Sequence, residues 1–304
     1  MSGRAAGAAP GTIFRQAAPA KLNLYLHITG RRADGYHLVD SLIAFAAIHD
    51  TIEARDADAL TLVIEGPFAG VLGREPDNLV LRAARALAEL AGVRSGAAIT
   101  LVKRLPVASG IGGGSADAAA TLRALQRLWG VNLSEPQRTE LALSLGADVP
   151  MCLGGQAAFA GGVGADLVPV RSLPSAGLVL VNPLLALSTA AVFKARTGPF
   201  GTAARFGDAP RDVASLARIL AERRNALEPA ATMLCPAISQ VLAALDQAPG
   251  CRFARMSGSG ATCFGLFDDE IAARSAAQAL AAARPDWWVA PSRLVADTAD
   301  LPAD

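Results

Sequence analysis

The sequence predicts an α+β protein built from two lobes. Stretches that alternate apolar and polar residues, as strands do, are interspersed with stretches of helical spacing, and no internal repeat is evident. A glycine-rich stretch at residues 161–164 interrupts this pattern near the middle of the 304 residues. We therefore expect an N-terminal domain at 12–164 and a C-terminal domain at 165–304, preceded by a disordered tail at 1–11.

The first predicted elements are a strand and a turn. Residues 20–29 alternate, with leucines on one face and Lys21 and Asn23 on the other, so these two polar side chains should lie side by side. Asp34 and Gly35 then predict a turn. The other elements expected before residue 164 are strands at 42–48, 51–54, 60–64 and 98–103, and helices at 79–90, after Ser115 and at 135–145, with glycines 92 and 146 ending the first and last of these helices.

The C-terminal part of the chain is predicted to alternate in the same way. Its expected elements are strands at 178–181 and 263–267 and helices at 213–222, 237–246 and 271–283. A cleft between the two lobes is where we expect ligands to bind and the active site to lie.

Composition excludes several classes of function. The formal net charge of +1 provides no field for nucleic acid or an anionic membrane. The four cysteines show no Cys-x-x-Cys spacing and the three histidines are scattered, so neither a zinc site nor a disulfide framework is indicated. No apolar run approaches the roughly 18 residues that span a membrane. We expect a cytoplasmic protein that is a monomer or a weak homodimer.

The stretch at 106–120 joins a glycine-rich loop to the start of a helix. Glycine lets the backbone adopt positive φ and approach a ligand closely, and the loop contains four: Gly110, Gly112, Gly113 and Gly114. Ser115 is predicted to cap the helix, whose unpaired N–H groups would then point into the loop. Such an arrangement is suited to holding phosphate.

The residues that follow the loop glycines exclude two well-known kinds of phosphate-binding loop. A Walker A loop ends in Gly-Lys-Ser/Thr, and no lysine follows Gly114. A dinucleotide fingerprint would have a third glycine where Ser115 stands. A tight strand-to-helix turn with no ligand remains an alternative at this point, although consecutive glycines are costly in chain entropy.

The pattern Pro-x-x-x-Gly-x-Gly-Gly-Gly-Ser-Ala resembles the phosphate loop of the GHMP kinases, named for galactokinase and homoserine, mevalonate and phosphomevalonate kinases. Four further segments in the same order extend the resemblance over nearly the whole chain: 19–30, 32–37, 145–150 and 257–262. Together they resemble the branch of the family that phosphorylates a hydroxyl of a cytidine diphosphate-linked alcohol. The resemblance implies the two-lobed GHMP kinase fold.

The resemblance implies ATP and Mg²⁺ as cofactors. The phosphates would contact Gly110, Gly112, Gly113, Gly114 and Ser115. The adenine would lie near Asn78, Leu79, Lys103 and Pro106. Magnesium is expected from the chemistry, but no acidic cluster identifies its ligands.

Two departures from a common family form are visible. Ala116-Asp117 stands where Ser-Asn is common, so the backbone must carry more of the phosphate binding, and Asp117 is expected to add negative charge near the γ-phosphate. The segment 224–228 resembles an Asn-Asp-Leu-Glu motif with Ala226 in place of the Asp, which leaves the role of that Asp in doubt here.

Asp148, Lys21 and Asn23 are the predicted catalytic cluster. Phosphoryl transfer needs an aligned hydroxyl, a base and charge neutralisation. Asp148 precedes Val149-Pro150, which we expect to hold the backbone extended and fix the side chain. An isolated Asp here could equally be a turn residue, but the resemblance identifies it as the base. Lys21 would offset phosphoryl charge, and Asn23 could bond the acceptor hydroxyl.

The substrate end is predicted at Tyr36 and His37. An aromatic ring offers a stacking platform for a base and an imidazole can hydrogen-bond a cytosine edge. Taken alone, such a pair on a loop is more often a surface anchor. By resemblance it holds the cytidine, with Phe193 as the candidate aromatic from the second lobe and Thr189 as a further contact.

Two alternatives stay open from the sequence. One is a sister kinase acting on homoserine or mevalonate, which Tyr36 and His37 argue against because neither substrate has a base to stack. The other is a catalytically silent nucleotide-binding regulator. The combined presence of Lys21, Asn23 and Asp148 argues against it, because a sensor needs no base.

Overall fold

The computed structural model describes residues 11–72 and 78–303. The predicted tail at 1–11 therefore lies, except for Gly11, outside the described residues. The strands are β1 (Phe14–Arg31), β2 (His37–Ala57), β3 (Thr61–Glu65), β4 (Gly96–Val102), β5 (Ala158–Gly161), β6 (Asp166–Pro169), β7 (Gly177–Asn182), β8 (Cys251–Met256), β9 (Cys263–Phe267) and β10 (Trp288–Val295). The helices are α1 (Ala69–Leu72), α2 (Leu79–Ala91), α3 (Gly113–Trp129), α4 (Glu135–Leu145), α5 (Val149–Gly154), α6 (Thr189–Ala195), α7 (Val213–Ala221), α8 (Glu228–Leu234), α9 (Ala237–Asp246) and α10 (Glu270–Ala283), followed by a short 3-10 helix at Thr298–Asp300.

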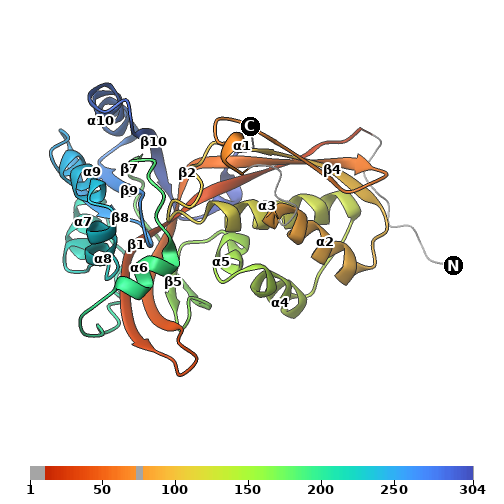
Figure 1. The fold of residues 1–304 in the computed structure, drawn as a ribbon, viewed down its shortest axis with the longest axis horizontal. Helices are drawn as coiled ribbons and strands as arrows, with labels where there is room; N and C mark the ends of the chain where they lie inside the picture. Colours follow the sequence, from red (N-terminus) through yellow and green to blue (C-terminus); the bar gives the residue numbers. More distant parts are fainter. Residues whose placement is uncertain (1–10, 73–77, 304) are drawn as a thin grey trace.

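All ten strands belong to one connected sheet. Its main path runs β3-β4-β2-β10-β7-β9-β8, and β1 and β5 also pair with β2. Helices α2 to α5 lie beside the part of the sheet near β4, whereas α7 to α10 cover the outer side of β7, β8 and β9 (Figure 1). The predicted α+β class with helices and strands in both parts of the chain is confirmed.

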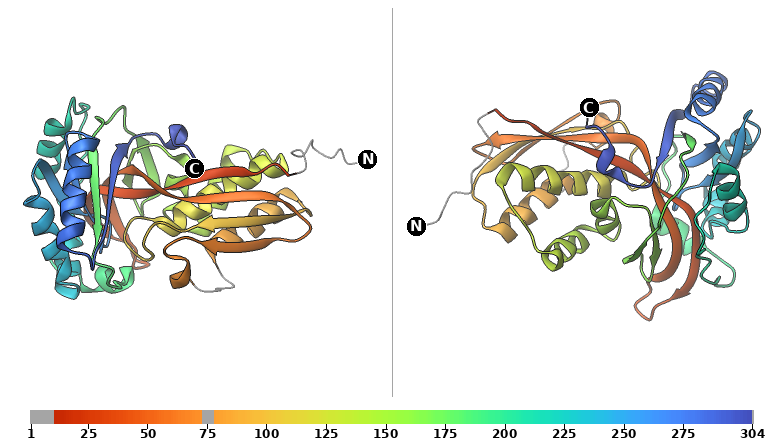
Figure 2. Two further views of the ribbon diagram at one scale, coloured as in Figure 1. Left: turned by 90° about the horizontal axis from the view of Figure 1, so that it is seen from above. Right: turned by 180° about the vertical axis from the view of Figure 1, so that it is seen from behind.

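Strands β1 and β2 form a long antiparallel pair that runs through both parts of the molecule (Figure 2). The predicted strands 42–48 and 51–54 are one continuous strand in the structure, which corrects the sequence prediction. The polar Asp50 between them does not break the strand, because its carboxylate accepts backbone hydrogen bonds from Arg104 and Leu105. Polar residues inside a strand are tolerated when they are paired in this way.

Three large apolar clusters and a smaller fourth one fill the interior of the described part of the chain, and two of the large clusters show how the helices are attached to the sheet. One joins α2 and α3 to the sheet through side chains such as Leu87, Ile99 and Leu125. The other packs α9 and α10 on β7 and β9, and includes Leu26 and Ile28 of β1. Because β1 contributes to this second cluster, the first strand stabilises both parts of the fold.

Two local predictions around the glycine-rich loop and Asp148 are wrong. Helix α3 begins at Gly113 with Gly112 as its N-cap, so Ser115 lies inside the first turn. Asp148 has helical backbone angles, φ −86° and ψ −12°, and α5 follows it directly, with Pro150 in the first turn of that helix. Proline is tolerated there because the first N–H groups of a helix have no intrahelical partner.

Most other predicted elements are present within a residue or two of the expected bounds. Gly92 ends α2 in the left-handed conformation at φ 64°, as expected. In the part of the chain that the structure describes, no helix combines the length and the apolar character needed to cross a membrane.

Candidate active site

A cavity of about 610 Å³ is lined by residues from both halves of the chain. It is bounded by β1, β2, the glycine-rich loop, the start of α5, α6 and the loop between β8 and β9. Twelve of the predicted site residues line it: Lys21, Asn23, Tyr36, Leu79, Gly110, Gly112, Gly113, Gly114, Ser115, Asp148, Thr189 and Phe193. The fold thus brings together motifs that are far apart in sequence.

Lys21 and Asp148 form an ion pair on the wall of this cavity. The Nζ of Lys21 lies 3.2 Å from Oδ2 of Asp148. The lysine side chain is only 6% exposed, whereas that of Asp148 is 46% exposed, so the carboxylate can be reached from the cavity. The backbone N–H of Lys21 donates to the carbonyl of Ile111, which ties β1 to the glycine-rich loop.

Asn23 is held in a fixed orientation beside Lys21. Its Oδ1 accepts a hydrogen bond of 3.0 Å from Lys21, and its Nδ2 donates to Ser41 at 2.8 Å. The backbone N–H of Asn23 donates to Ser257. The sequence analysis missed Ser41 and Ser257 as supporting residues. The signal available was a hydroxyl at Ser41, directly before the apolar run at 42–48, and a serine next to Gly258.

The glycine-rich loop packs directly against the loop between β8 and β9. Gly110 and Gly112 have positive φ angles of 76° and 64°. A Cβ at Gly110 would lie 2.5 Å from the carbonyl oxygen of Gly260. The hydroxyl of Ser257 also donates to the carbonyl of Gly110. The glycine at 110 is therefore required both by its conformation and by this close approach.

We expect Gly110→Ala to lower the free energy of unfolding by about 1–3 kcal/mol, because it adds strain at positive φ and a contact with Gly260. Urea denaturation measures this change as a lower midpoint. The control is Gly207→Ala, since a Cβ at Gly207 meets no atom within 4 Å. A midpoint for Gly110→Ala equal to that of the control would contradict the packing described here.

A second, smaller cavity of about 290 Å³ adjoins the loop on the side of α2. Gly113 and Gly114 line both cavities. The residues predicted near adenine all line the second one: Asn78, Leu79, Lys103 and Pro106. Asn78 also caps α2, since its Oδ1 accepts from the N–H of Val80.

Asp117 does not present a free negative charge to the phosphate loop, which corrects the prediction. It is 3% exposed and accepts a 2.6 Å hydrogen bond from Lys103. Lys103 donates equally to Asp50. Burial opposes the charge of Lys103, but the two carboxylates outweigh it and raise the pKa of the ammonium group. Lys103 thus lies between two buried carboxyl groups beside the loop.

Of the predicted aromatic residues, Tyr36 and Phe193 line the larger cavity and His37 does not. Tyr36 is 68% exposed. The rings of His37 and Phe193 contact each other, with centroids 5.1 Å apart and planes inclined by 34°, which leaves no room for a base between them. Burial, together with Arg31 and Arg196, lowers the pKa of His37. Thr189 hydrogen-bonds Ser259 at 2.8 Å.

The segment 224–228 supports the loop between β8 and β9. The side-chain amide of Asn225 donates to the carbonyls of Met256 and Gly258, each at 2.8 Å. The N–H of Ala226 donates to the carbonyl of Leu26. Asn225 therefore positions the loop that touches Gly110, a role that the sequence did not reveal.

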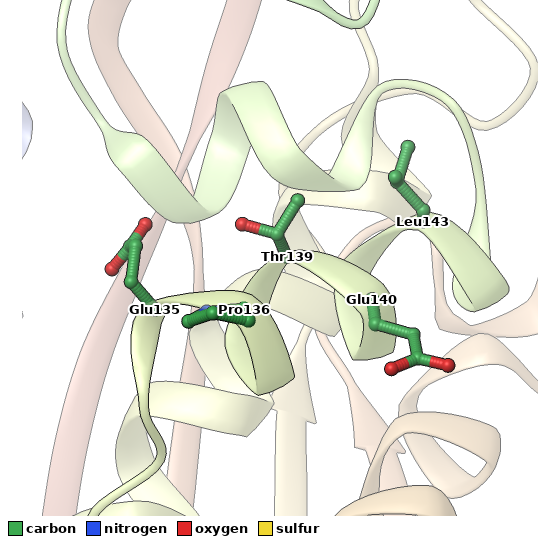
Figure 3. A pocket seen from close by; sticks show the side chains of 5 residues that line it. All are labelled: Glu135, Pro136, Thr139, Glu140 and Leu143. Atoms are coloured by element: carbon green, nitrogen blue, oxygen red, sulfur yellow. The ribbon is translucent and has the colours of Figure 1, made fainter.

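A further hollow lies on α4, lined by Glu135, Pro136, Thr139, Glu140 and Leu143 (Figure 3). It shares no lining residue with the two cavities at the loop. All its side chains come from one helix, and none belongs to the predicted site.

Residues 78–156 match the GHMP kinases N terminal domain and residues 207–286 match the GHMP kinases C terminal domain. A homoserine kinase from Cytophaga hutchinsonii shares the fold, with a TM-score of 0.68, 19% identity and coverage of 95% of this chain and 97% of that chain. The fold and the site thus define an ATP-using small-molecule kinase of the GHMP superfamily.

Closer similarity is to one branch of this superfamily. The 4-diphosphocytidyl-2-C-methyl-D-erythritol kinase of Paramagnetospirillum magneticum is 55% identical over 93% of this chain and 99% of its own length. That of Rhodospirillum rubrum is 52% identical over 95% of each. A crystal structure of 4-(cytidine 5'-diphospho)-2C-methyl-D-erythritol kinase has a TM-score of 0.76 at 36% identity, covering 92% of this chain and 99% of the other. The chain belongs to the 4-diphosphocytidyl-2-C-methyl-D-erythritol kinases.

Proposed function

We propose that this kinase transfers the γ-phosphoryl group of ATP to the 2-hydroxyl of 4-diphosphocytidyl-2-C-methyl-D-erythritol, giving the 2-phosphate and ADP in non-mevalonate isoprenoid biosynthesis. The observation that carries the mechanism is the Lys21–Asp148 pair, 3.2 Å apart in a cavity lined by the glycine-rich loop. A base, a cation and a phosphate cradle on one wall are what in-line phosphoryl transfer requires.

In this mechanism Asp148 accepts the proton of the 2-hydroxyl as the hydroxyl oxygen attacks the γ-phosphorus. The bond from that phosphorus to the β–γ bridging oxygen breaks, and ADP leaves. Lys21 stabilises the negative charge that develops on the transferring group. Asn23 is oriented by Ser41 and Lys21, and in this proposal its second Nδ2 hydrogen donates to the acceptor hydroxyl.

ATP is proposed to place its phosphates against the loop glycines and Ser115, and its adenine in the smaller cavity by Asn78, Leu79, Lys103 and Pro106. The shared lining residues Gly113 and Gly114 would join the two sites. Within the described residues no group of three His, Cys, Asp or Glu side chains could hold a metal ion. We therefore propose that Mg²⁺ enters with ATP, held mainly by phosphate oxygens and water, and neutralises phosphate charge.

Tyr36 and Phe193 are proposed to contact the cytosine ring. We expect Tyr36→Ala and Phe193→Ala to raise the KM for the cytidine substrate about 5- to 160-fold, since stacking of one base on an aromatic contributes about 1–3 kcal/mol. The KM for ATP should stay constant. Steady-state kinetics with each substrate varied in turn measures both values.

Phe200→Ala is the matched control for this prediction. Phe200 is 51% exposed, contacts Arg196 and does not line the cavity. It should leave both KM values within about twofold. If Phe200→Ala raised the KM for the cytidine substrate as much as Phe193→Ala, the proposed base site would be wrong.

The function itself is tested by mixing the purified protein with ATP, Mg²⁺ and candidate alcohols and following ADP. Turnover with the cytidine-linked alcohol alone is expected. Turnover with homoserine or mevalonate instead would contradict the proposed substrate and would identify the protein as a sister kinase. Nucleotide binding without any turnover would favour a silent regulator.

The domain division near residue 164, a cytoplasmic location and a monomeric or weakly dimeric state are also proposed. Composition and the glycine-rich stretch at 161–164 support them. Light scattering across a range of protein concentrations tests the oligomeric state.

A further inference from the structure

Three charged side chains meet in the interior beneath the phosphate loop. The Nζ of Lys103, at the end of β4, lies 2.6 Å from Asp50 of β2 and 2.6 Å from Asp117 of α3. None of the three side chains is more than 4% exposed. We call these residues the buried charge cluster. It joins two strands of the sheet to the helix that begins in the loop.

The two carboxylates of the cluster are not equivalent. Asp50 uses both oxygens, since Oδ2 accepts from Lys103 and Oδ1 accepts from the N–H groups of Arg104 and Leu105. Asp117 uses only Oδ2, and its Oδ1 is buried without a hydrogen-bond partner. A buried carboxylate oxygen with no donor is costly, so Asp117 is the poorer place for a negative charge.

Charge counting points the same way. With both aspartates ionised the cluster would carry a net charge of −1 in the protein interior, close to the site proposed for ATP phosphates. A proton on Asp117 makes the cluster neutral. We propose that Asp117 is protonated in the working enzyme, and that this neutral cluster favours the binding of nucleotide phosphates at the loop. Asp117 is thus a positioning residue for ATP.

The surroundings of Asp117 support this assignment. Burial raises its pKa to about 8, although Lys103 lowers it, and the charge of Asp50 adds to the rise. Cys152 of α5 also interacts electrostatically with Asp117, and the Lys21 side chain lies beside Gly112 at the start of α3. Cys152 of α5 has its pKa raised to about 12, chiefly by burial. Lys21 of β1 directs its ammonium group to Asp148.

The cluster is near enough to influence the loop. A Cβ built on Gly113, the first residue of α3, would lie 3.2 Å from Nζ of Lys103 and 3.9 Å from Asp50. Lys103 and Asp117 also line the smaller cavity together with Gly113 and Gly114 of the loop. Anionic phosphate bound at the loop would be repelled by a net negative cluster. The binding of nucleotide phosphates at the loop and the protonation of Asp117 are therefore coupled, and each favours the other.

Asp117→Asn tests the proposal, because Asn is neutral at every pH and keeps an oxygen for Lys103. Between the ordinary aspartate pKa of about 3.9 and about 8, folding of the wild type takes up a proton, so its stability falls as pH rises. The Tm of the wild type should fall relative to that of Asp117→Asn by roughly 2 °C per pH unit from pH 5 to 8, and then level off. This arm needs no nucleotide.

The second arm measures the Kd of a non-hydrolysable ATP analogue with Mg²⁺ by calorimetry at pH 7.5 and 9.5. The wild-type Kd should rise at least about fivefold, and that of Asp117→Asn should stay nearly constant. Asp286→Asn is the control, because it also removes one negative charge, but from an exposed ion pair with Arg284. The pH dependence of its Tm and of its Kd should be the same as in the wild type.

This inference rests on the proposed assignment of the loop to ATP phosphates, and the two arms separate the failures. Parallel Tm curves for wild type and Asp117→Asn would show that Asp117 carries no proton and would overturn the proposal. A Kd that rises equally in both proteins would overturn the coupling to phosphate. An analogue that binds at neither pH, with diverging Tm curves, would overturn the loop assignment and leave the protonated Asp117 supported.

Discussion

Asp148→Asn is expected to lower kcat by about 10²–10⁴-fold, the usual cost of losing a general base. Asn has nearly the same shape, but it cannot accept the proton of the acceptor hydroxyl. The Asp148 side chain is 46% exposed, so the fold should tolerate the change. Rapid-quench measurement of a single turnover at saturating substrates isolates the chemical step.

The matched readout is nucleotide affinity. A non-hydrolysable ATP analogue should bind Asp148→Asn with a Kd within about threefold of wild type, because the phosphates are proposed to contact backbone groups of the loop. Unchanged turnover would remove Asp148 from the mechanism. Loss of turnover together with loss of nucleotide binding would indicate a damaged site rather than a missing base.

Lys21→Met should reduce kcat by about 10²–10³-fold, as the removal of one group that stabilises transition-state charge does. Methionine fills most of the space of the lysine, whose side chain is 6% exposed, but it supplies no positive charge. It also removes the hydrogen bond that fixes Asn23. The KM for the cytidine substrate should change less than kcat, and initial rates over a substrate range measure both.

Lys194→Met controls for the loss of one positive charge. Lys194 is exposed on α6 and does not line the cavity. Its kcat should remain within about twofold of wild type. If both lysine variants lost activity equally, the effect would be one of net charge, and the role proposed for Lys21 would fail.

The geometry of the catalytic cluster followed from the sequence to a large extent. Period-two spacing predicted that Lys21 and Asn23 lie side by side, and the structure has them hydrogen-bonded. Their proximity to Asp148 came only from the resemblance, because strand periodicity contains no information about a contact across 127 residues. The roles of all three stay predictions.

The errors concern places where local rules compete. Ser115 is a good capping residue, but Gly112 precedes it in the left-handed conformation and α3 starts three residues earlier than a Ser115 cap would allow. Val149-Pro150 favours an extended chain or a first helical turn, and tertiary packing of Val149 in the core selects the helix. Sequence periodicity does not decide between such alternatives.

The buried charge cluster was the least predictable feature. Asp50 sits in a strand, Lys103 follows another and Asp117 lies on a helix, so only the fold makes them neighbours. Charged residues are rarely buried unless they are paired, and the motif alone led to the expectation that Asp117 adds negative charge near the γ-phosphate. The hydrogen bond to Lys103 shows that this carboxyl group is not free.

The central claim is that the acceptor hydroxyl, Asp148 and the γ-phosphate meet in the larger cavity. A crystal structure with a non-hydrolysable ATP analogue and the cytidine-linked alcohol tests it most directly. We predict the 2-hydroxyl oxygen at about 2.6–3.2 Å from a carboxylate oxygen of Asp148, in line with the γ-phosphorus. A 2-hydroxyl bound away from Asp148, with the γ-phosphate outside the glycine-rich loop, would contradict the mechanism.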